Sequence, residues 1–253
     1  MLEKQIREQI ISLINREVVP AVGCTEPMCV SLCVAKATET LGCRPEKITA
    51  LLSANILKNA MGVGIPGTGM IGLPIAIALG ALVGKSEYQL EVIKDLTREI
   101  LEEGKQYVSE DHIDIKLKQG ITEKLYVEIR CEAQGHEATA IIAHSHTNIV
   151  YVERDGNAIL DRRTPQAGAA EQKDIQLNMR MVYDFAMTTP EEEISFILKT
   201  RDYNIRAAEE SKKANYGHCL GKTIDRPLSH GIFGNSIFSH IISKTASACD
   251  ARI

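Results

Sequence analysis

The stretch that decides the fold is LYVEIRCEAQGHEATAIIAHSHTNIVYVERDG, residues 125–156. Apolar and polar residues alternate from Leu125 to Cys131, which is the period of a β-strand with one buried face. Residues 137–153 predict one or two further strands, and Asp155-Gly156 is typical of a tight hairpin turn. With the same alternation from Ile113 to Leu117, the pattern predicts an antiparallel β-meander over residues 111–161 that has one face in water.

On both sides of this meander the apolar residues follow the 3.6-residue period of helices. Ser86 and Gln89 form a capping-box pattern, and the sequence Thr189-Pro190-Glu191-Glu192 is a strong helix start. Helices are therefore predicted over residues 2–19, 28–41, 87–103 and 190–213. We expect an α+β fold with a helical region at 1–110, the β-meander at 111–161, and a second helical region at 162–253.

Composition excludes several classes of function. The 253-residue chain has a net charge of −4 and no long basic run, which argues against nucleic acid or an anionic membrane as its partner. Its longest apolar stretch, Met70 to Val83, is short and interrupted by glycine and proline, so no membrane span is expected. A charge-rich amphipathic N-terminus and seven cysteines without a disulfide framework predict a cytoplasmic protein.

The first candidate for chemistry is Cys24, in the stretch PAVGCTEPMC at residues 20–29. Pro27 is placed like a first-turn proline, so Cys24 is expected at the N-terminus of a helix. The unpaired amides and positive partial charge of such a terminus favour a thiolate, which can act as a base, nucleophile or metal ligand. The alternative is that Cys24 is a small buried apolar residue.

The other cysteines point to packing. Cys24, Cys29 and Cys33 have the spacing C-x4-C-x3-C, which matches neither common ferredoxin pattern. Cys29 and Cys33 lie one turn apart in an apolar helix, and Cys131 is on the apolar face of a strand, so all three are expected in the core. The chain has no C-x-x-C motif, which makes a thiol-redox protein the weaker alternative.

A glycine-rich stretch at Gly62–Gly67 formally matches the dinucleotide fingerprint G-x-G-x-x-G. However, Pro66 removes one amide, and no second parallel strand ending in an acid follows. The stretch is better explained as a tight turn that lines a small anionic substrate site. Lys58 and Asn59 just before it are candidates to bind a carboxylate; the alternative is a solvated helix end.

His144 and His146 are two residues apart on a predicted strand, so they are expected to share a face. Such a pair can hold a metal ion, but no third ligand is evident nearby. His146 is the better candidate as a polar contact to a substrate.

Three longer motifs carry a resemblance to a known family: GCTEP at 23–27, KNAMGVGIPGTGMIGLP at 58–74, and HGIFGNSIF at 230–238. Over essentially its whole length the chain resembles the L-cysteine desulfidase family, which is related to the alpha chain of bacterial iron–sulfur L-serine dehydratases. The resemblance implies that L-cysteine is broken down to sulfide, ammonia and pyruvate with a [4Fe-4S] cluster and without pyridoxal phosphate. It gives Cys24 the role of general base for the α-proton, and the cluster that of a Lewis acid.

The motifs also imply a set of substrate contacts. The partner is expected to be a small amino acid, L-cysteine or L-serine, in a homo-oligomeric protein. Besides His146, the candidate substrate-binding residues are those of the three motifs: Thr25, Glu26, Lys58, Asn59, Gly67, Thr68 and Asn235.

The chain departs from the family pattern at its end. In the family the cluster-binding cysteines lie in a C-terminal section, and Cys249 does not match one of them. We therefore expect an N-terminal portion of such an enzyme, truncated at Ile253 and without metal ligands of its own. The alternatives are an L-serine dehydratase-like deaminase, or an inactive remnant that binds a small amino acid or only oligomerises.

Overall fold

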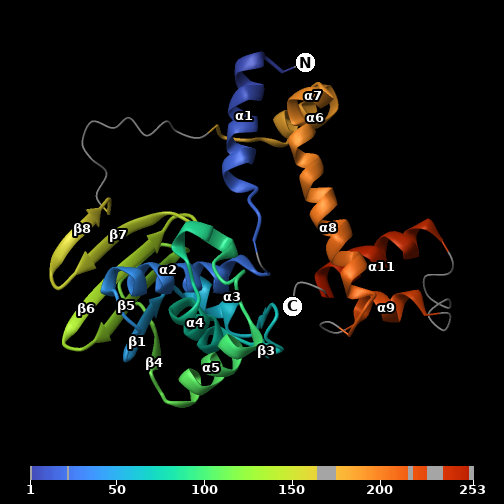
Figure 1. The fold of residues 1–253 in the computed structure, drawn as a ribbon. Coiled ribbons are helices and arrows are strands. Elements are labelled where there is room, and N and C mark those ends of the chain that lie inside the picture. The colour runs from blue at the N-terminus through green and yellow to red at the C-terminus, as the bar shows by residue number, and fades with distance from the viewer. Residues whose placement is uncertain (1, 22, 164–174, 216–218, 227–235, 251–253) are drawn as a thin grey trace. The chain divides into compact units, whose positions relative to one another are not determined.

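The computed structural model describes residues 2–21, 23–163, 175–215, 219–226 and 236–250 (Figure 1). The chain divides into two compact units. The central unit consists chiefly of Pro20–Gln166, and the terminal unit combines Met1–Val19 with Ala167–Ala251. The first helix thus belongs with the C-terminal helices, whereas the sequence placed it in the region 1–110.

The central unit is built on a six-stranded mixed sheet in the order β4-β1-β5-β6-β7-β8, so the protein has the predicted α+β fold. The last four strands form an antiparallel meander, as expected from their alternating residues and hairpin turns. The strands are β1 (Lys47–Leu52), β4 (Ile113–Leu117), β5 (Tyr126–Ala133), β6 (His136–Ala143), β7 (Ile149–Arg154) and β8 (Asn157–Asp161).

The predicted meander is wrong at its first strand. β4 does not pair with β5; it pairs in parallel with β1, which the sequence did not predict as a strand and which lies between them. The short stretch KITALL buries Ile48, Ala50 and Leu52 completely, so β1 stabilises the centre of the sheet by packing as well as by two hydrogen-bonded edges. The chain after β4 crosses the end of β1, where the amide of Lys118 donates to the carbonyl of Leu52.

Helices cover one face of this sheet (Figure 1). Helix α2 is apolar on most sides, as expected for a buried helix, and it packs on β5, β6 and β7 while α4 packs on α2 and α5 on α4. The elements are α2 (Thr25–Leu41), α3 (Ala54–Ala60), the hairpin of β2 (Gly64–Ile65) and β3 (Met70–Ile71), α4 (Leu73–Leu82), the 3-10 helix η1 (Ser86–Glu91) and α5 (Arg98–Ser109).

The predicted helix 87–103 is replaced by two shorter elements, η1 and α5. Gln89 has a φ of 54° and does not continue a helix, and the Ser86 amide and hydroxyl donate to the carboxylate of Glu39 on α2. The effective N-cap is Thr97, whose hydroxyl oxygen accepts a hydrogen bond from the amide of Ile100. The prediction that Ser86 caps this helix is therefore wrong, since the N-cap is Thr97.

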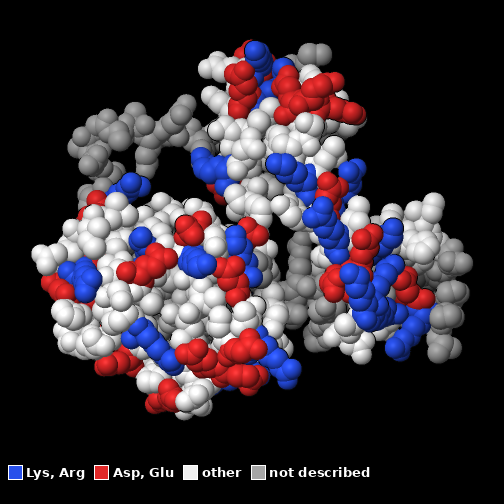
Figure 2. Space-filling model, viewed as in Figure 1, with Lys and Arg blue, Asp and Glu red and all other residues white. Residues whose placement is uncertain are grey.

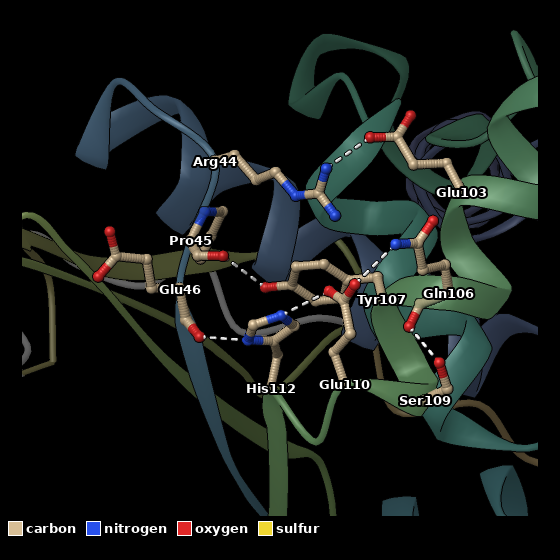
Figure 3. A network of polar contacts seen from close by, with 9 residues as sticks. All are labelled: Arg44, Pro45, Glu46, Glu103, Gln106, Tyr107, Ser109, Glu110 and His112. Carbon is tan, nitrogen blue, oxygen red and sulfur yellow. Dashed lines mark hydrogen bonds and ion pairs between the residues drawn. The ribbon is translucent and has the colours of Figure 1, made fainter.

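A polar network fastens the end of α5 to the sheet (Figure 3). The Tyr107 hydroxyl donates to the carbonyl of Pro45 at 2.7 Å, and the His112 ring lies between the Glu46 carbonyl and the Glu110 carboxylate. The guanidinium of Arg44 lies over the ring of Tyr107. These contacts join α5, the segment before β1 and the start of β4, and so fix the end of the sheet where β1 and β4 begin.

The terminal unit is helical. Arg7 on α1 forms two hydrogen bonds to the Glu193 carboxylate on α7, and both α8 and α9 pack on α11. The predicted helix 2–19 is confirmed as α1, whereas 190–213 contains three successive helical segments. The elements are α1 (Lys4–Glu17), α6 (Met179–Thr188), α7 (Glu191–Ile194), η2 (Ser195–Ile197), α8 (Leu198–Ser211), α9 (Leu220–Asp225) and α11 (Ile237–Asp250).

Lysine and arginine side chains are intermingled with acidic ones on the visible face of the central unit (Figure 2). Among the described residues, no helix is both long enough and apolar enough to cross a membrane.

Candidate functional site

The candidate site is built around Cys24, which occupies the N-cap position of α2. Gly23 immediately before it has a φ of 74°, a conformation that glycine adopts without steric cost, and this turns the chain into the helix. The helix begins at Thr25, three residues before the predicted start, with Pro27 in its first turn as expected. The half-buried thiol thus lies where the sequence predicted, at a helix N-terminus.

Glu26 connects Cys24 to a second helix. The Cys24 Sγ donates to Glu26 Oε2 at 3.0 Å, and the Thr25 hydroxyl donates to the same oxygen at 3.1 Å. The other oxygen, Oε1, accepts a hydrogen bond from Asn59 Nδ2 of α3 at 3.3 Å. Four of the predicted site residues, Cys24, Thr25, Glu26 and Asn59, are therefore joined through one carboxylate.

This carboxylate changes the expected state of the thiol. Partial burial and the hydrogen bond to Glu26 raise the pKa of Cys24, and they outweigh the amides of the helix start, which lower it. Burial alone would raise the pKa of Glu26, but hydrogen bonds from Cys24, Thr25 and Asn59 bring it below its ordinary value. The prediction of a partial thiolate is wrong for the resting site, because the negative charge resides on Glu26. The sequence feature that could have indicated this neutral thiol is Glu26, an acidic residue two positions after the capping cysteine.

The glycine-rich hairpin lies at the same end of α2 as Cys24, because α2 and α4 run in parallel. The Ser31 hydroxyl donates to the Ala76 carbonyl, and a Cβ on Gly80 would lie 2.7 Å from the Ser31 carbonyl oxygen. Further along α2, and just past the end of α4, a Cβ on Gly84 would meet the Cβ of Ala35. The N-termini of α2 and α4 are therefore neighbours, and the hairpin of β2 and β3 leads directly into α4.

Within this hairpin the candidate residues differ in their surroundings. The Thr68 hydroxyl is buried, donating to the Ile65 carbonyl at 2.6 Å and accepting from the Met70 amide at 2.9 Å, so it closes the turn. Gly67 is exposed, with a φ of 77°, and Lys58 is exposed on α3. Because β2 is two residues long and antiparallel to β3, the stretch has neither the strand nor the topology of a dinucleotide site.

His144 and His146 lie in the loop between β6 and β7, so the prediction that they share a strand face is wrong. Strand β6 ends at Ala143, and His144 has a φ of 72° that takes the chain out of the sheet. The loop is at the end of the sheet where β5 begins, since the His144 amide donates to the Leu125 carbonyl.

The N-terminus of α2 points to the same end of the sheet. Thr38 contacts Cys131 far along β5, whereas Cys33, earlier in the helix, contacts the Val127 carbonyl near the start of that strand. Cys24 lies further in this direction, about 13 Å beyond Cys33 along the helix. His146 is half-buried in the loop at this end. Asn235 lies outside the described residues.

The described residues do not fit an iron–sulfur cluster. None of them form a group of three or more histidine, cysteine, aspartate or glutamate side chains placed to hold a metal ion. Cys29 and Cys33 are fully buried, and burial raises the pKa of both thiols, whereas a cluster is held by thiolates. The packing role expected for Cys29, Cys33 and Cys131 is confirmed, since all three are fully buried.

The chain is similar over nearly its full length to bacterial UPF0597 proteins. It is 62% identical over 254 residues to one from Phocaeicola vulgatus, covering 100% of the chain and 59% of the relative. The identity is 60% over 247 residues for one from Bacteroides fragilis, with 98% and 58% covered, and 40% over 246 residues for one from Oleidesulfovibrio alaskensis, with 96% and 57% covered. The chain thus spans somewhat under 60% of the length of these relatives. No family model matches it. No solved structure matches it.

Proposed function

We propose that this site binds a small amino acid and that Cys24 accepts its α-proton in the elimination of sulfide from L-cysteine, or of water from L-serine. The observation that carries the proposal is the Cys24–Glu26–Asn59 group, in which a thiol at a helix N-terminus is hydrogen-bonded to an ionised carboxylate. A general base must lie within hydrogen-bonding reach of the proton that it removes. Here the base is also hydrogen-bonded to a carboxylate that can accept its proton. The resemblance of the three motifs to those of L-cysteine desulfidases supports the choice of substrate.

The reaction balances with one water molecule. The base removes the proton from Cα, and the Cβ–S bond breaks. Sulfide departs, and aminoacrylate is formed. This tautomerises to an imine, and water then converts the imine to pyruvate and ammonia. L-serine would follow the same course with hydroxide as the leaving group. The chain's own contribution would be to hold the substrate and move the α-proton.

The surroundings of Cys24 support a position for the substrate carboxylate. The adjacent N-termini of α2 and α4 carry positive partial charge, and the glycine hairpin allows close approach to backbone amides. Exposed Lys58, on the same helix as Asn59, adds a cation. These features favour a small anionic group next to the thiol.

A second candidate function is binding without turnover. It is favoured by the raised pKa of Cys24, because a neutral thiol is a poor base. In this case the chain would be a folded module that binds an amino acid or contributes to an oligomer.

The test completes this chain with the part of the Phocaeicola vulgatus relative that the chain does not cover, and measures pyruvate and sulfide formed anaerobically by this extended protein from L-cysteine and L-serine. We expect Cys24→Ser to lower kcat by about 100-fold or more, the usual contribution of a general base. Cys43→Ser is the matched control, since Cys43 is a half-buried cysteine that follows the opposite end of α2.

Retained turnover in Cys24→Ser would refute the role of Cys24. Calorimetry then distinguishes the second candidate: L-serine that binds the 253-residue chain, without product from the extended protein, would identify a binding module.

A further inference from the structure

We infer that Glu26 recognises the α-ammonium group of the amino-acid ligand, and that this contact frees the Cys24 thiol to ionise. The inference rests on the proposed function in taking the ligand to be a small amino acid. It makes the site selective for amino acids over the corresponding hydroxy acids, and it makes the ligand itself the activator of the thiol.

Glu26 is singled out by the distribution of charge along the chain. Between Pro20 and Gly84 there are three acidic residues, Glu26, Glu39 and Glu46. Glu39 lies in the last turn of α2, and Glu46 follows that helix. The glycine hairpin and α4 contain no titratable side chain, and α3 contributes only Lys58. From these elements an ammonium group at the Cys24 end would meet a single carboxylate.

The hydrogen bonds of Glu26 allow an ammonium group to replace one of the present donors. Its three side-chain donors, Cys24, Thr25 and Asn59, are all neutral. An ammonium group is a charged donor and forms the stronger hydrogen bond to a carboxylate, whereas a thiol is a weak donor. The ligand would therefore replace the thiol at Oε2, while Asn59 holds Oε1 and keeps the carboxylate in place. Asn59 is thus a positioning residue.

The exchange would reverse the effect of Glu26 on the thiol. In the resting site the carboxylate accepts the S–H bond and adds a negative charge beside the sulfur, and both raise the pKa of Cys24. An ammonium group on Glu26 cancels that charge and places a cation near the sulfur, which favours the thiolate. The S–H bond then breaks, its proton passes to water, and the thiolate can accept the α-proton of the bound ligand. The other titratable groups toward this end include Cys29, whose pKa the Glu26 charge also raises, Lys58, the loop histidines His144 and His146, and Tyr126 at the start of β5.

The experiment titrates the thiol directly in the 253-residue chain. Cysteine labelled with carbon-13 at Cβ reports ionisation by its chemical shift, and the Cys24 signal is assigned by its loss in Cys24→Ser. We expect a midpoint above that of a free cysteine in the wild type, and a lower one in Glu26→Gln. Glu39→Gln, the same change near the other end of α2, should leave the Cys24 midpoint unchanged.

Two matched ligands then test the recognition step. L-serine should lower the Cys24 midpoint in the wild type but not in Glu26→Gln. L-glycerate, which has a hydroxyl in place of the ammonium group, should leave the midpoint unchanged in both. Glu26→Asp keeps the charge, so it should retain part of the response to L-serine if Glu26→Gln does not fold.

An unchanged midpoint in Glu26→Gln, no response to L-serine, or equal shifts with the two ligands would each overturn the inference. Because titration does not depend on turnover, the two proposals fail separately. A normal response to L-serine with no pyruvate from the extended protein would refute only the lyase. Pyruvate formation with a midpoint insensitive to Glu26 would refute only the role of Glu26.

Discussion

At the scale of single residues, the central unit depends on polar side chains that are buried with partners. The side chain of Tyr107 is fully buried, and its hydroxyl donates to the Pro45 carbonyl beside the Arg44 and His112 contacts (Figure 3). Burial raises the pKa of this phenol. Such a hydroxyl stabilises the fold because removing it leaves a buried carbonyl without its donor.

Tyr107→Phe should therefore lower the free energy of unfolding by about 1–2 kcal/mol. Urea denaturation measures the change, which should appear in the midpoint without a change in slope. Tyr88→Phe is the control, because the polar contacts of the Tyr88 hydroxyl, with Lys85 and Asp95, are exposed to solvent and their loss should cost little. Equal stabilities of the two variants would show that the Tyr107 hydrogen bond has no net effect.

The ionisation of Glu128 is expected to make the free energy of unfolding depend on pH. Burial would raise the pKa of this carboxyl, but hydrogen bonds from Lys118, Tyr126 and Arg130 outweigh burial and lower it. A lowered pKa stabilises the fold above the unfolded-state value of about 4.3, and this stabilisation is lost as the pH falls through the folded-state value.

Glu128→Gln should thus flatten the loss of stability below about pH 4.5, measured as urea midpoints between pH 7 and pH 3. Glu132→Gln on the same strand is the control, since Glu132 pairs with Lys47 at the surface. A wild-type pH profile in Glu128→Gln would contradict the prediction.

At the scale of elements, the site depends on the close approach of α2 and α4, which places the glycine hairpin beside Cys24. A Cβ at Gly80 would lie 2.7 Å from the Ser31 carbonyl oxygen and 3.0 Å from its Cα. These are backbone atoms of a buried helix, so they move only if the two helices separate.

Gly80→Ala should lower the free energy of unfolding by about 2 kcal/mol or more, within the usual cost of overpacking. Thermal and urea unfolding measure it. Gly62→Ala is the matched control, because its Cβ would meet nothing within 4 Å and it should be neutral or slightly stabilising. If Gly80→Ala is as stable as Gly62→Ala, the contact between the helices is looser than described.

The helices and strands also show how much of the fold could be predicted from the sequence. Periodicity predicted α1 and the strands from β5 to β7, because each has a repeating apolar face of its own. The Asp155-Gly156 turn indicated the hairpin to β8, and α2 was predicted from an apolar run that ends at Gly42. It missed β1 because six residues give little pattern, and because its pairing with β4 depends on a chain crossing that no local signal encodes. The N-cap position of Cys24 was predicted from Gly23 and Pro27. The neutral state of its thiol was not, since it depends on a carboxylate held by Asn59, 33 residues along the chain.

At the scale of the whole molecule, the two units have separate cores. The large apolar cluster of the central unit draws on residues between Ala21 and Ile149, with no member from the terminal unit. The terminal unit instead joins the two ends of the chain, through contacts such as that of Arg7 with Glu193.

A fragment of residues 20–163 should therefore fold by itself, with one cooperative urea transition and hydrogen-exchange protection in β5 and β6 like that of the full chain. Deleting residues 1–19 from the full chain should reduce protection in α7 and α8 and leave β5 and β6 unchanged. Loss of protection in β5 after that deletion would show that the cores are not independent.

The order of synthesis gives the split terminal unit a further consequence. Helix α1 leaves the ribosome first, yet the segment that completes its unit begins roughly 150 residues later. At 5–20 residues per second this is a wait of about 8–30 s, during which the whole central unit emerges and can fold. During this interval the nascent chain carries an amphipathic helix with an uncovered apolar stripe. Chaperones that bind such stripes would bind the nascent protein at α1, and release it only when the helices that follow Ala167 have emerged.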